Sequence, residues 1–444
     1  MKPRPPLPPG PYLVVGLARS GEAAAIALRA RGEEVIGCDA GADGRLREVA
    51  GRLRQAGVEI HLNASGAVLA ARAGTLIKSP GVPQDAPAVR AARAAGVPVL
   101  SELELAWTLL DNEFIAVTGT NGKTTTTEWI GHIHREAGAP VAVAGNVGRA
   151  LSALIGTVDP DATIVCETSS FQLEDTDRFS PEAAALLNLA PDHLDRHGSY
   201  EAYVGAKLRI FANQGNDDIA AIPDDLGIED IGGCARQVLF GRTAAAEVAE
   251  RAGELWWVDR PLLPTAELSL PGAHNVDNAM AAAAVCLARG IDPEAVTTGL
   301  TTFTGVAHRL ELIRTINGVS YVNDSKATNV ASTIVALRAI PRGIHLIAGG
   351  RGKQQDFTPL APLISERCAG VYLIGEAATE IDAAISATGV PIAGVLDLAR
   401  AVGRASAVAN SGDVVLLSPA CASYDQYRDF EARGDHFRAL VEAL

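Results

Sequence analysis

The stretch V-T-G-T-N-G-K-T-T, Val117–Thr125, joins the end of an apolar strand to a glycine-rich turn, a lysine and paired threonines. In such a turn the backbone N–H groups surround phosphates, Lys123 reaches the terminal ones, and the Thr124 hydroxyl can hold Mg²⁺. A helix is expected to follow, so the positive end of its dipole also faces the nucleotide. Gly119 lies three residues before Gly122, which makes the loop shorter than the common G-x-x-x-x-G-K-[ST] pattern. The stretch predicts an α/β nucleotide-binding core.

The composition of the chain fits a large α/β protein. Its 444 residues suffice for about three domains. Hydrophobic residues make up 48% and aromatic residues only 5%, so the cores are expected to consist of Ala, Val, Leu and Ile, as in parallel sheets. The net charge of −14 argues against non-specific nucleic-acid binding. If the ligands are phosphates, the basic groups that hold them must be concentrated locally.

Cysteine usage and the N-terminus indicate a cytoplasmic enzyme or binding protein. The six cysteines are scattered without a C-x-x-C pair, as expected of buried residues in a reducing compartment. The proline-rich start M-K-P-R-P-P-L-P-P-G-P lacks the apolar stretch of a signal peptide, and no apolar run approaches the length of a membrane span.

Apolar strands alternating with helical segments predict three Rossmann-like domains in tandem, the central one a P-loop ATPase-type, mostly parallel sheet. The first turn, G-L-A-R-S-G, departs from G-x-G-x-x-G, so dinucleotide binding is only weakly indicated. Expected domains are 1–104, 105–304, which contains the phosphate loop, and 305–444. The main expected strands are Tyr12–Gly16, Glu34–Asp39, Thr75–Ser79, Val141–Ala144, Thr163–Glu167, Ala184–Leu189, Ile219–Ile222, Ser320–Asp324, Ile344–Ala348, Val371–Ile374 and Asp413–Leu417.

Three side chains after the loop suggest metal or phosphate chemistry. Glu167 ends a buried strand, where ligands bind in open α/β sheets, and a carboxylate there suits Mg²⁺; a helix-capping acid is the alternative. His193 also follows a strand end, between acids, although a lone histidine is usually structural. Lys207 lies on a predicted amphipathic helix, and the sequence of that helix alone indicates that the lysine is solvated.

A series of spaced motifs changes that assessment. The order T-G-T-N-G-K-T-T, G-N-V-G, E-T-S-S-F-Q-L-E, D-H-L-D-R-H, A-K, H-N-V-D-N, G-V-A-H-R, N-D-S-K-A-T-N and L-S-P-A-C-A-S-Y-D-Q-Y runs from about residue 117 to 427. It resembles the Mur ligase family. S-S-F-Q-L-E and S-P-A-C-A-S resemble its glutamate-adding branch, and the D-N-P-R/A type motif of the diaminopimelate- or lysine-adding branch is not found.

The resemblance implies an ATP-dependent amide ligase that adds D-glutamate to UDP-N-acetylmuramoyl-L-alanine through an acyl phosphate in peptidoglycan synthesis. It implies that domain 1–104 binds the UDP-sugar, domain 105–304 binds ATP and domain 305–444 binds the amino acid. It also implies two Mg²⁺ sites and a Lys207 that is carbamylated by CO₂. The implied catalytic residues are Lys123, Glu167, His193 and Lys207, and the implied metal ligands are Thr124, Glu167, His193 and the Lys207 carbamate. The implied ATP-binding residues are Gly119, Thr120, Asn121, Gly122, Lys123, Thr124, Thr125, Asn275, Asn278, Arg309 and Asp324.

The substrate residues follow from the same resemblance. Asp39-Ala40-Gly41 departs from the family's usual Thr and Arg, so Arg19 or Arg45 is an alternative diphosphate contact there. Lys353 follows G-G-R-G, and its K-x-x-D partner Asp356 is retained. The acceptor would meet Gly16, Ser20, Asp39, Ser79, Asn146, Ser169 and Gln172, and the amino acid would meet Lys326, Thr328, Lys353, Ser423, Tyr424 and Phe430.

Other functions remain open on the sequence. A folylpolyglutamate synthase would share the ATP loop, but its folate motifs are absent and S-S-F-Q-L-E is present. A ligase for L-glutamate, a P-loop ATPase acting on a partner protein, and a non-enzymatic Rossmann module are further alternatives. The resemblance implies a monomer that uses small-molecule substrates, with no nucleic-acid or membrane partner. Domain closure is expected at hinges near Leu110–Glu113 and Phe303–Ala307.

Overall fold

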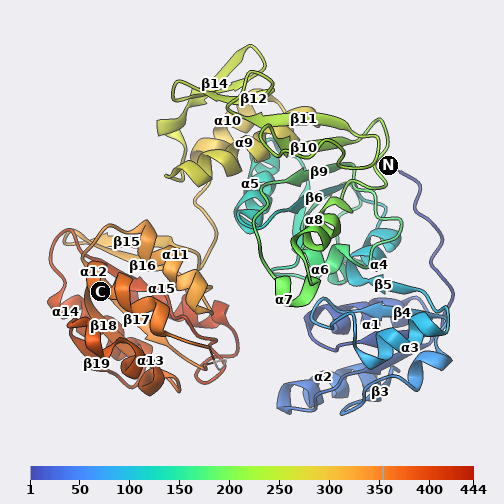
Figure 1. The fold of residues 1–444 in the computed structure, drawn as a ribbon, viewed down its shortest axis with the longest axis horizontal. Coiled ribbons are helices and arrows are strands. Elements are labelled where there is room, and N and C mark those ends of the chain that lie inside the picture. Colours follow the sequence, from blue (N-terminus) through green and yellow to red (C-terminus); the bar gives the residue numbers. More distant parts are fainter. Residues whose placement is uncertain (1, 353–354) are drawn as a thin grey trace. The chain divides into compact units, whose positions relative to one another are not determined.

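The computed structural model describes residues 2–352 and 355–444. The chain forms two compact units, Met1–Thr304 and Gly305–Leu444 (Figure 1). The first unit contains two sheets and the second contains one, and helices cover each sheet. The predicted α/β class with three mostly parallel sheets is confirmed. The division at residue 104 stays a prediction.

The N-terminal sheet has five parallel strands in the order β3-β2-β1-β4-β5. Tyr12 and Val14 pack with α1, α2 and α4 on one face, and Leu13 and Val15 pack with α3 on the other. Because both faces are covered, the two strands β1 and β2 carry no polar side chain other than that of Tyr12. The elements are β1 (Tyr12–Val15), α1 (Arg19–Ala30), β2 (Val35–Cys38), α2 (Gly44–Gln55), β3 (Glu59–His61), β4 (Thr75–Lys78), α3 (Pro87–Ala94), β5 (Val99–Ser101) and α4 (Glu102–Leu109).

The central sheet has nine strands in the order β14-β13-β12-β11-β10-β9-β6-β8-β7. One face packs against α4 through Trp107, and α5 and α9 lie along the other. The first elements are β6 (Phe114–Thr118), α5 (Lys123–Glu136), β7 (Val141–Gly145), β8 (Thr163–Glu167), α6 (Ser170–Leu173), β9 (Ala183–Leu186), α7 (Leu194–His197), α8 (Tyr200–Leu208) and β10 (Ile219–Pro223).

The remaining elements of this sheet include strands that the sequence did not clearly predict. Four strands form between residues 236 and 264, where no main strand was expected. Each of the last two strands pairs antiparallel with the strand before it, so short hairpins extend the sheet. The elements are β11 (Arg236–Gly241), β12 (Val248–Arg251), β13 (Glu254–Trp257), β14 (Arg260–Pro264), α9 (Ala273–Ala288) and α10 (Pro293–Thr302).

The second unit has a six-stranded sheet in the order β15-β16-β20-β17-β18-β19. Helices α11, α12 and α13 share one core with it, and α14 and α15 share the core on the opposite face. Only β15 runs antiparallel to its neighbour. The elements are β15 (Glu311–Ile316), β16 (Val319–Asn323), α11 (Val330–Ala339), β17 (Ile344–Gly349), α12 (Ala361–Arg367), β18 (Cys368–Ile374), α13 (Ala378–Ile385), β19 (Ile392–Gly394), α14 (Leu398–Val408), β20 (Val414–Leu417) and α15 (Phe430–Glu442).

The proline-rich N-terminal segment links the two sheets of the first unit. The Arg4 guanidinium lies 4.7 Å from the Trp107 ring centroid and donates to the backbone carbonyls of Leu110 and Asn112. Further along, the carbonyl of Pro9 accepts a hydrogen bond from the Thr75 hydroxyl at 2.9 Å. The segment therefore braces the connection between α4 and β6.

None of the helices formed by residues 2–352 and 355–444 has both the length and the apolar character that a membrane span requires.

Candidate active site

The phosphate loop lies between β6 and α5, as the sequence predicts. Gly119 and Gly122 adopt φ angles of 151° and 84°, which side chains with a Cβ rarely take. Helix α5 begins directly after Gly122, so the N–H groups of its first turn face the loop. The Lys123 ammonium folds back and donates to the carbonyls of Gly119 and Thr120, each at 2.9 Å. The loop therefore combines an anion-binding helix end with a cation.

A carboxylate, a hydroxyl and an amide meet beside this loop. Glu167, at the end of β8, accepts a hydrogen bond from the Thr124 hydroxyl at 2.7 Å through one oxygen. Its other oxygen accepts from the Asn146 amide at 2.9 Å. These are hard oxygen donors of the kind Mg²⁺ prefers, and Mg²⁺ commonly takes only one or two carboxylates together with substrate phosphates. The residues present therefore fit a magnesium ion.

Lys207 lies in the interior, which corrects the interpretation of a solvated helix lysine. The residue is 2% exposed, and its ammonium donates to the Gly119 carbonyl at 2.8 Å. Lys123 donates to the same carbonyl. Burial and the nearby Lys123 charge lower the pKa of Lys207 to about 7. The Tyr203 ring lies 4.7 Å from the Lys207 nitrogen, and its hydroxyl pairs with that of Thr120 at 2.8 Å.

His193 lies at the surface, in a left-handed conformation with φ of 52° before the short helix α7. Its ring centroid is 4.8 Å from that of Phe171, and its Nε2 is 3.6 Å from an Asp192 oxygen. Among residues 2–352 and 355–444, no three His, Cys, Asp or Glu side chains cluster as a metal site. The proposed metal ligation by His193 thus stays a prediction.

Asn275 and Asn278, two of the predicted ATP-binding residues, lie in the first two turns of α9. The Asn278 amide donates to the Asn275 side-chain oxygen at 3.2 Å. A Cβ placed on Gly122 would lie 2.2 Å from the Asn278 oxygen, so Asn278 packs directly on the phosphate loop.

The predicted acceptor residues of the N-terminal sheet hold two turns together. The Ser79 hydroxyl donates to the Gly16 carbonyl at 2.7 Å. Asp39 accepts from the Leu17 N–H at 2.8 Å, so its carboxylate orders the turn between β1 and α1, the helix that contains Ser20. These groups stand at the carboxyl ends of β1, β2 and β4, where ligands bind in such sheets.

Ser169 and Gln172 form a reciprocal capping box at the start of α6. Gln172 has no exposed surface. Its side-chain oxygen accepts from both the N–H and the hydroxyl of Ser169, at 3.0 and 3.1 Å. Gln172 therefore fixes the orientation of Ser169 through these hydrogen bonds. The direct contact between Gln172 and the substrate stays a prediction.

In the second unit, predicted residues gather at the carboxyl edge of the sheet. Asp324 is buried and accepts from the Ser418 hydroxyl at 2.7 Å, and burial raises the pKa of Asp324 to about 7. The Phe430 carbonyl accepts from the Ser325 hydroxyl at 2.8 Å. Ser423 is buried and Tyr424 is half exposed. Arg309, Lys326 and Thr328 lie in the loops on either side of β15 and β16, and Lys353 lies outside the described residues.

Comparisons with known proteins agree with this geometry. Residues 117–286 match the model of the Mur ligase middle domain, and residues 308–421 match that of the Mur ligase glutamate ligase domain. The chain belongs to the Mur ligase family. It is an enzyme, an ATP-dependent ligase, and the resemblance inferred from its motifs is confirmed.

Similar proteins extend over nearly the whole chain. A UDP-N-acetylmuramoylalanine–D-glutamate ligase of Koribacter versatilis is 42% identical over 441 residues, 97% of each chain. Ligases with the same description from Acidobacterium capsulatum and Myxococcus xanthus are 43% and 42% identical, over 97% of this chain and 96% and 98% of theirs. The solved UDP-N-acetylmuramate–alanine ligase of Thermotoga maritima has a TM-score of 0.60 at 22% identity, covering 98% of this chain and 100% of that one. That likeness supports the Mur ligase fold.

Several residues next to the predicted site residues of each unit were not predicted from the sequence. In the first unit, the Tyr203 ring contacts Lys207 one turn away on α8, and the Phe171 ring contacts His193, which follows a different strand. Arg433 is buried on α15 and donates to the carbonyls of Ser325 and Cys421. No local motif distinguishes these residues from ordinary core or surface side chains.

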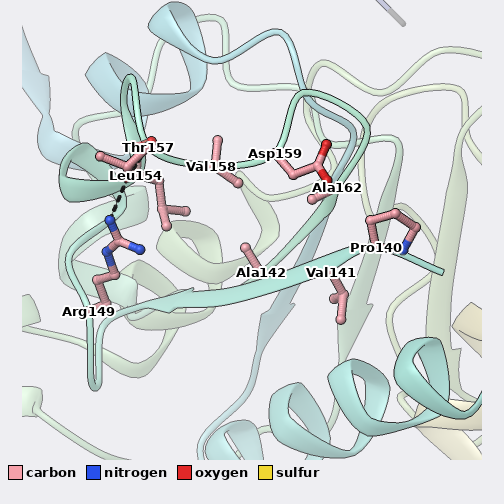
Figure 2. A pocket seen from close by; sticks show the side chains of 9 residues that line it. All are labelled: Pro140, Val141, Ala142, Arg149, Leu154, Thr157, Val158, Asp159 and Ala162. Atoms are coloured by element: carbon pink, nitrogen blue, oxygen red, sulfur yellow. Dashed lines mark hydrogen bonds between the residues drawn. The ribbon is translucent and has the colours of Figure 1, made fainter. Parts of the chain in front are cut away.

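A separate cavity of about 370 Å³ lies beside β7, at the edge of the central sheet (Figure 2). Arg149 crosses it and donates to the Thr157 hydroxyl at 2.6 Å. None of the predicted site residues lines this cavity. It is therefore distinct from the phosphate loop.

The phosphate loop yields a test with a matched control. In Gly122→Ala the new Cβ would collide with Asn278, and the φ of 84° would cost about 1–2 kcal/mol. Gly138, just beyond the other end of α5, has a φ of 68° with nothing within 4 Å of a Cβ. We expect Gly122→Ala to weaken ATP binding at least about tenfold, whereas Gly138→Ala lowers only stability. Calorimetric titration with ATP checks this, and equal ATP affinities in the two variants would contradict it.

Proposed function

We propose that this Mur ligase joins the amine of D-glutamate to the lactoyl-linked L-alanine carboxylate of UDP-N-acetylmuramoyl-L-alanine. ATP is cleaved to ADP and phosphate, and the enzyme acts in the cytoplasm as a monomer. The observation that carries the proposal is the cluster of Thr124, Glu167, Asn146 and Lys207 around one phosphate loop. The relatives of 42–43% identity, described as ligases of D-glutamate, support this choice of substrates.

In the first step, an oxygen of the alanyl carboxylate attacks the γ-phosphorus of ATP. The bond from that phosphorus to the β,γ-bridging oxygen breaks, and ADP leaves with the bond's electrons. In the second step, the glutamate amine attacks the acyl carbon of the acyl phosphate, inorganic phosphate leaves, and the nitrogen loses a proton to solvent. The product is an amide.

Charge repulsion is the main obstacle to the first step, since both reactants are anionic. At about 4 Å and an effective dielectric of about 20, each pair of like charges costs about 4 kcal/mol. The N–H groups at the start of α5 would offset this cost, and so would the Lys123 ammonium once it exchanges the Gly119 and Thr120 carbonyls for phosphate oxygens. Two Mg²⁺ ions, held by Thr124, Glu167, His193 and a modified Lys207, would neutralise phosphate charge.

We further propose that Lys207 carries a carbamate. The ammonium would first lose one proton. The neutral amine would then attack CO₂, form the N–C bond and release a second proton, so a cation becomes an anion. Burial and the competition of Lys207 and Lys123 for the Gly119 carbonyl disfavour a second ammonium there. A carbamate would supply the additional anionic oxygen that a second metal ion needs.

The carbamate proposal predicts dependence on CO₂. We expect Lys207→Ala and Lys207→Arg to lose activity about 100-fold, because neither side chain can form a stable carbamate. Depleting CO₂ should lower wild-type activity, and bicarbonate should restore it. With ¹³C-labelled bicarbonate, a carbamate NMR signal should appear in wild type and be missing in Lys207→Arg. Full activity of Lys207→Ala together with no effect of bicarbonate would contradict the proposal.

The second unit is proposed to bind the amino acid and to contact ATP. Lys326, Thr328, Lys353, Ser423, Tyr424 and Phe430 would hold glutamate, and Arg309 and Asp324 would contact ATP. Lysine ammonium groups suit a ligand with two carboxylates, because charge-assisted hydrogen bonds are stronger than neutral ones.

For this pocket, we expect Lys326→Met to raise the KM for D-glutamate about 10- to 100-fold, the effect of losing one charge-assisted bond. The KM for ATP should stay nearly unchanged. Arg400→Met is the control, since Arg400 is an exposed side chain on α14. Steady-state kinetics with each substrate varied in turn measures both constants. An equal rise in the KM for D-glutamate and for ATP would refute the assignment.

The substrates themselves are tested by phosphate release from ATP and Mg²⁺ with UDP-N-acetylmuramoyl-L-alanine. D-Glutamate, L-glutamate, L-lysine and meso-diaminopimelate are added in turn. We expect release with D-glutamate alone, together with the mass gain of one glutamyl group on the UDP-sugar. Release with L-glutamate would correct the stereochemistry and keep the mechanism. Release without any acceptor would instead indicate an ATPase.

A further inference from the structure

Arg196 joins two loops that approach the proposed site from different sheets. It lies on α7, three residues after His193. One of its terminal nitrogens donates to the backbone carbonyls of Pro80, at 2.8 Å, and Val82, at 3.0 Å. Those carbonyls belong to the loop after β4 of the N-terminal sheet, whereas α7 follows β9 of the central sheet.

The guanidinium is also held from the central sheet. Its carbon lies 3.7 Å from the centroid of the Phe171 ring, within the range of a cation–π contact. Phe171 follows Glu167 by four residues, and its ring centroid is 4.8 Å from that of His193. Through Phe171 and through its own helix, Arg196 is therefore linked to the two short segments that carry the proposed metal ligands Glu167 and His193.

The loop to which Arg196 donates its hydrogen bonds contains Ser79, a proposed contact of the acceptor substrate. Ser79 begins this loop, and its hydroxyl donates to the Gly16 carbonyl at 2.7 Å. The buried Lys78 ammonium also holds this loop: it donates to the Val82 carbonyl at 3.0 Å and pairs with Asp175 at 2.9 Å. Val82 is thus held by two cations at once, one from each sheet. The turn has little freedom to shift without moving Gly16 and Ser79.

We infer that Arg196 is a positioning residue for the acceptor substrate, and this inference rests on the proposed function. By tying the Ser79 loop to the His193 and Glu167 segments, it sets where the acceptor carboxylate stands relative to the γ-phosphate. Attack on phosphorus requires reacting atoms about 3–3.5 Å apart, and an error of about 1 Å can cost about 100-fold in rate. A contact remote from the reacting atoms can therefore control the first step.

Arginine suits this task for a physical reason. Its planar group can lie on an aromatic face while its N–H groups donate within the same plane to two carbonyls. A lysine ammonium is a compact point charge on a flexible stem and cannot do both. The contact should therefore depend on the shape of the side chain as well as on its charge.

The test compares Arg196→Met and Arg196→Lys with wild type. We expect Arg196→Met to lower kcat/KM for UDP-N-acetylmuramoyl-L-alanine about 100-fold while the KM for ATP stays within about twofold. Arg196→Lys should recover only part of the loss. Calorimetric binding of the UDP-sugar without ATP should weaken in parallel, independently of turnover.

Two further variants make the test specific. Arg367 in the second unit likewise donates to backbone carbonyls, those of Leu337, Arg338 and Ile340. Arg367→Met therefore removes comparable hydrogen bonds away from the Ser79 loop, and it should leave the KM and affinity for the acceptor unchanged. Phe171→Leu removes the ring beneath Arg196 and keeps the possibility of both hydrogen bonds. It should give an intermediate rise in the acceptor KM, even if Arg196→Met fails to fold.

The inference is overturned if Arg196→Met keeps the wild-type acceptor KM and affinity, if it raises the KM for ATP equally, or if Arg196→Lys behaves as wild type. Failure of the proposed function has a different signature. In that case wild type itself would neither bind the UDP-sugar nor release phosphate with it and D-glutamate.

Discussion

The parallel pairing of β6 with β8 is the constraint on which the proposed ATP site depends. Val117 stands opposite Glu167 in this register, so the phosphate loop and the carboxylate leave the sheet at the same edge. On the other side β6 pairs with β9, which brings Leu187 against Gly119. A slip of one residue would turn Glu167 to the opposite face of the sheet and separate it from Thr124.

The chemistry of the site also depends on where the chain uses lysine. The sequence has six lysines among its 38 lysine and arginine residues, and Lys123 and Lys207 share one carbonyl of the phosphate loop. Arginine cannot lose its proton in a protein, whereas a buried lysine can become a neutral nucleophile. Burial and a neighbouring cation together favour that neutral form of Lys207.

The acceptor side is built differently, from close backbone contacts between two turns. A Cβ on Gly21 would lie 1.9 Å from the Gly16 carbonyl, so only glycine allows α1 to start so near the end of β1. Ser79 then bridges to Gly16, and Lys78 and Arg196 fix the loop from either sheet. The proposed acceptor turn is thereby anchored where the two sheets of the first unit meet.

The sequence by itself determined the phosphate loop, the apolar strands on either side of it and the family. These features are local, because a glycine turn, a following helix and a run of apolar residues depend on neighbours in the chain. It also placed Glu167 beside Thr124, since parallel strands end at a common edge.

Only the tertiary structure decided the rest. Lys207 lies 88 residues beyond Gly119, and nothing in its helix indicates that the side chain is buried. The burial of Gln172, the rings of Phe171 and Tyr203, and the grip of Arg196 on Pro80 and Val82 likewise depend on segments that meet only after folding. Local patterns report which residues face a core, whereas the environment of one polar side chain is set by distant partners.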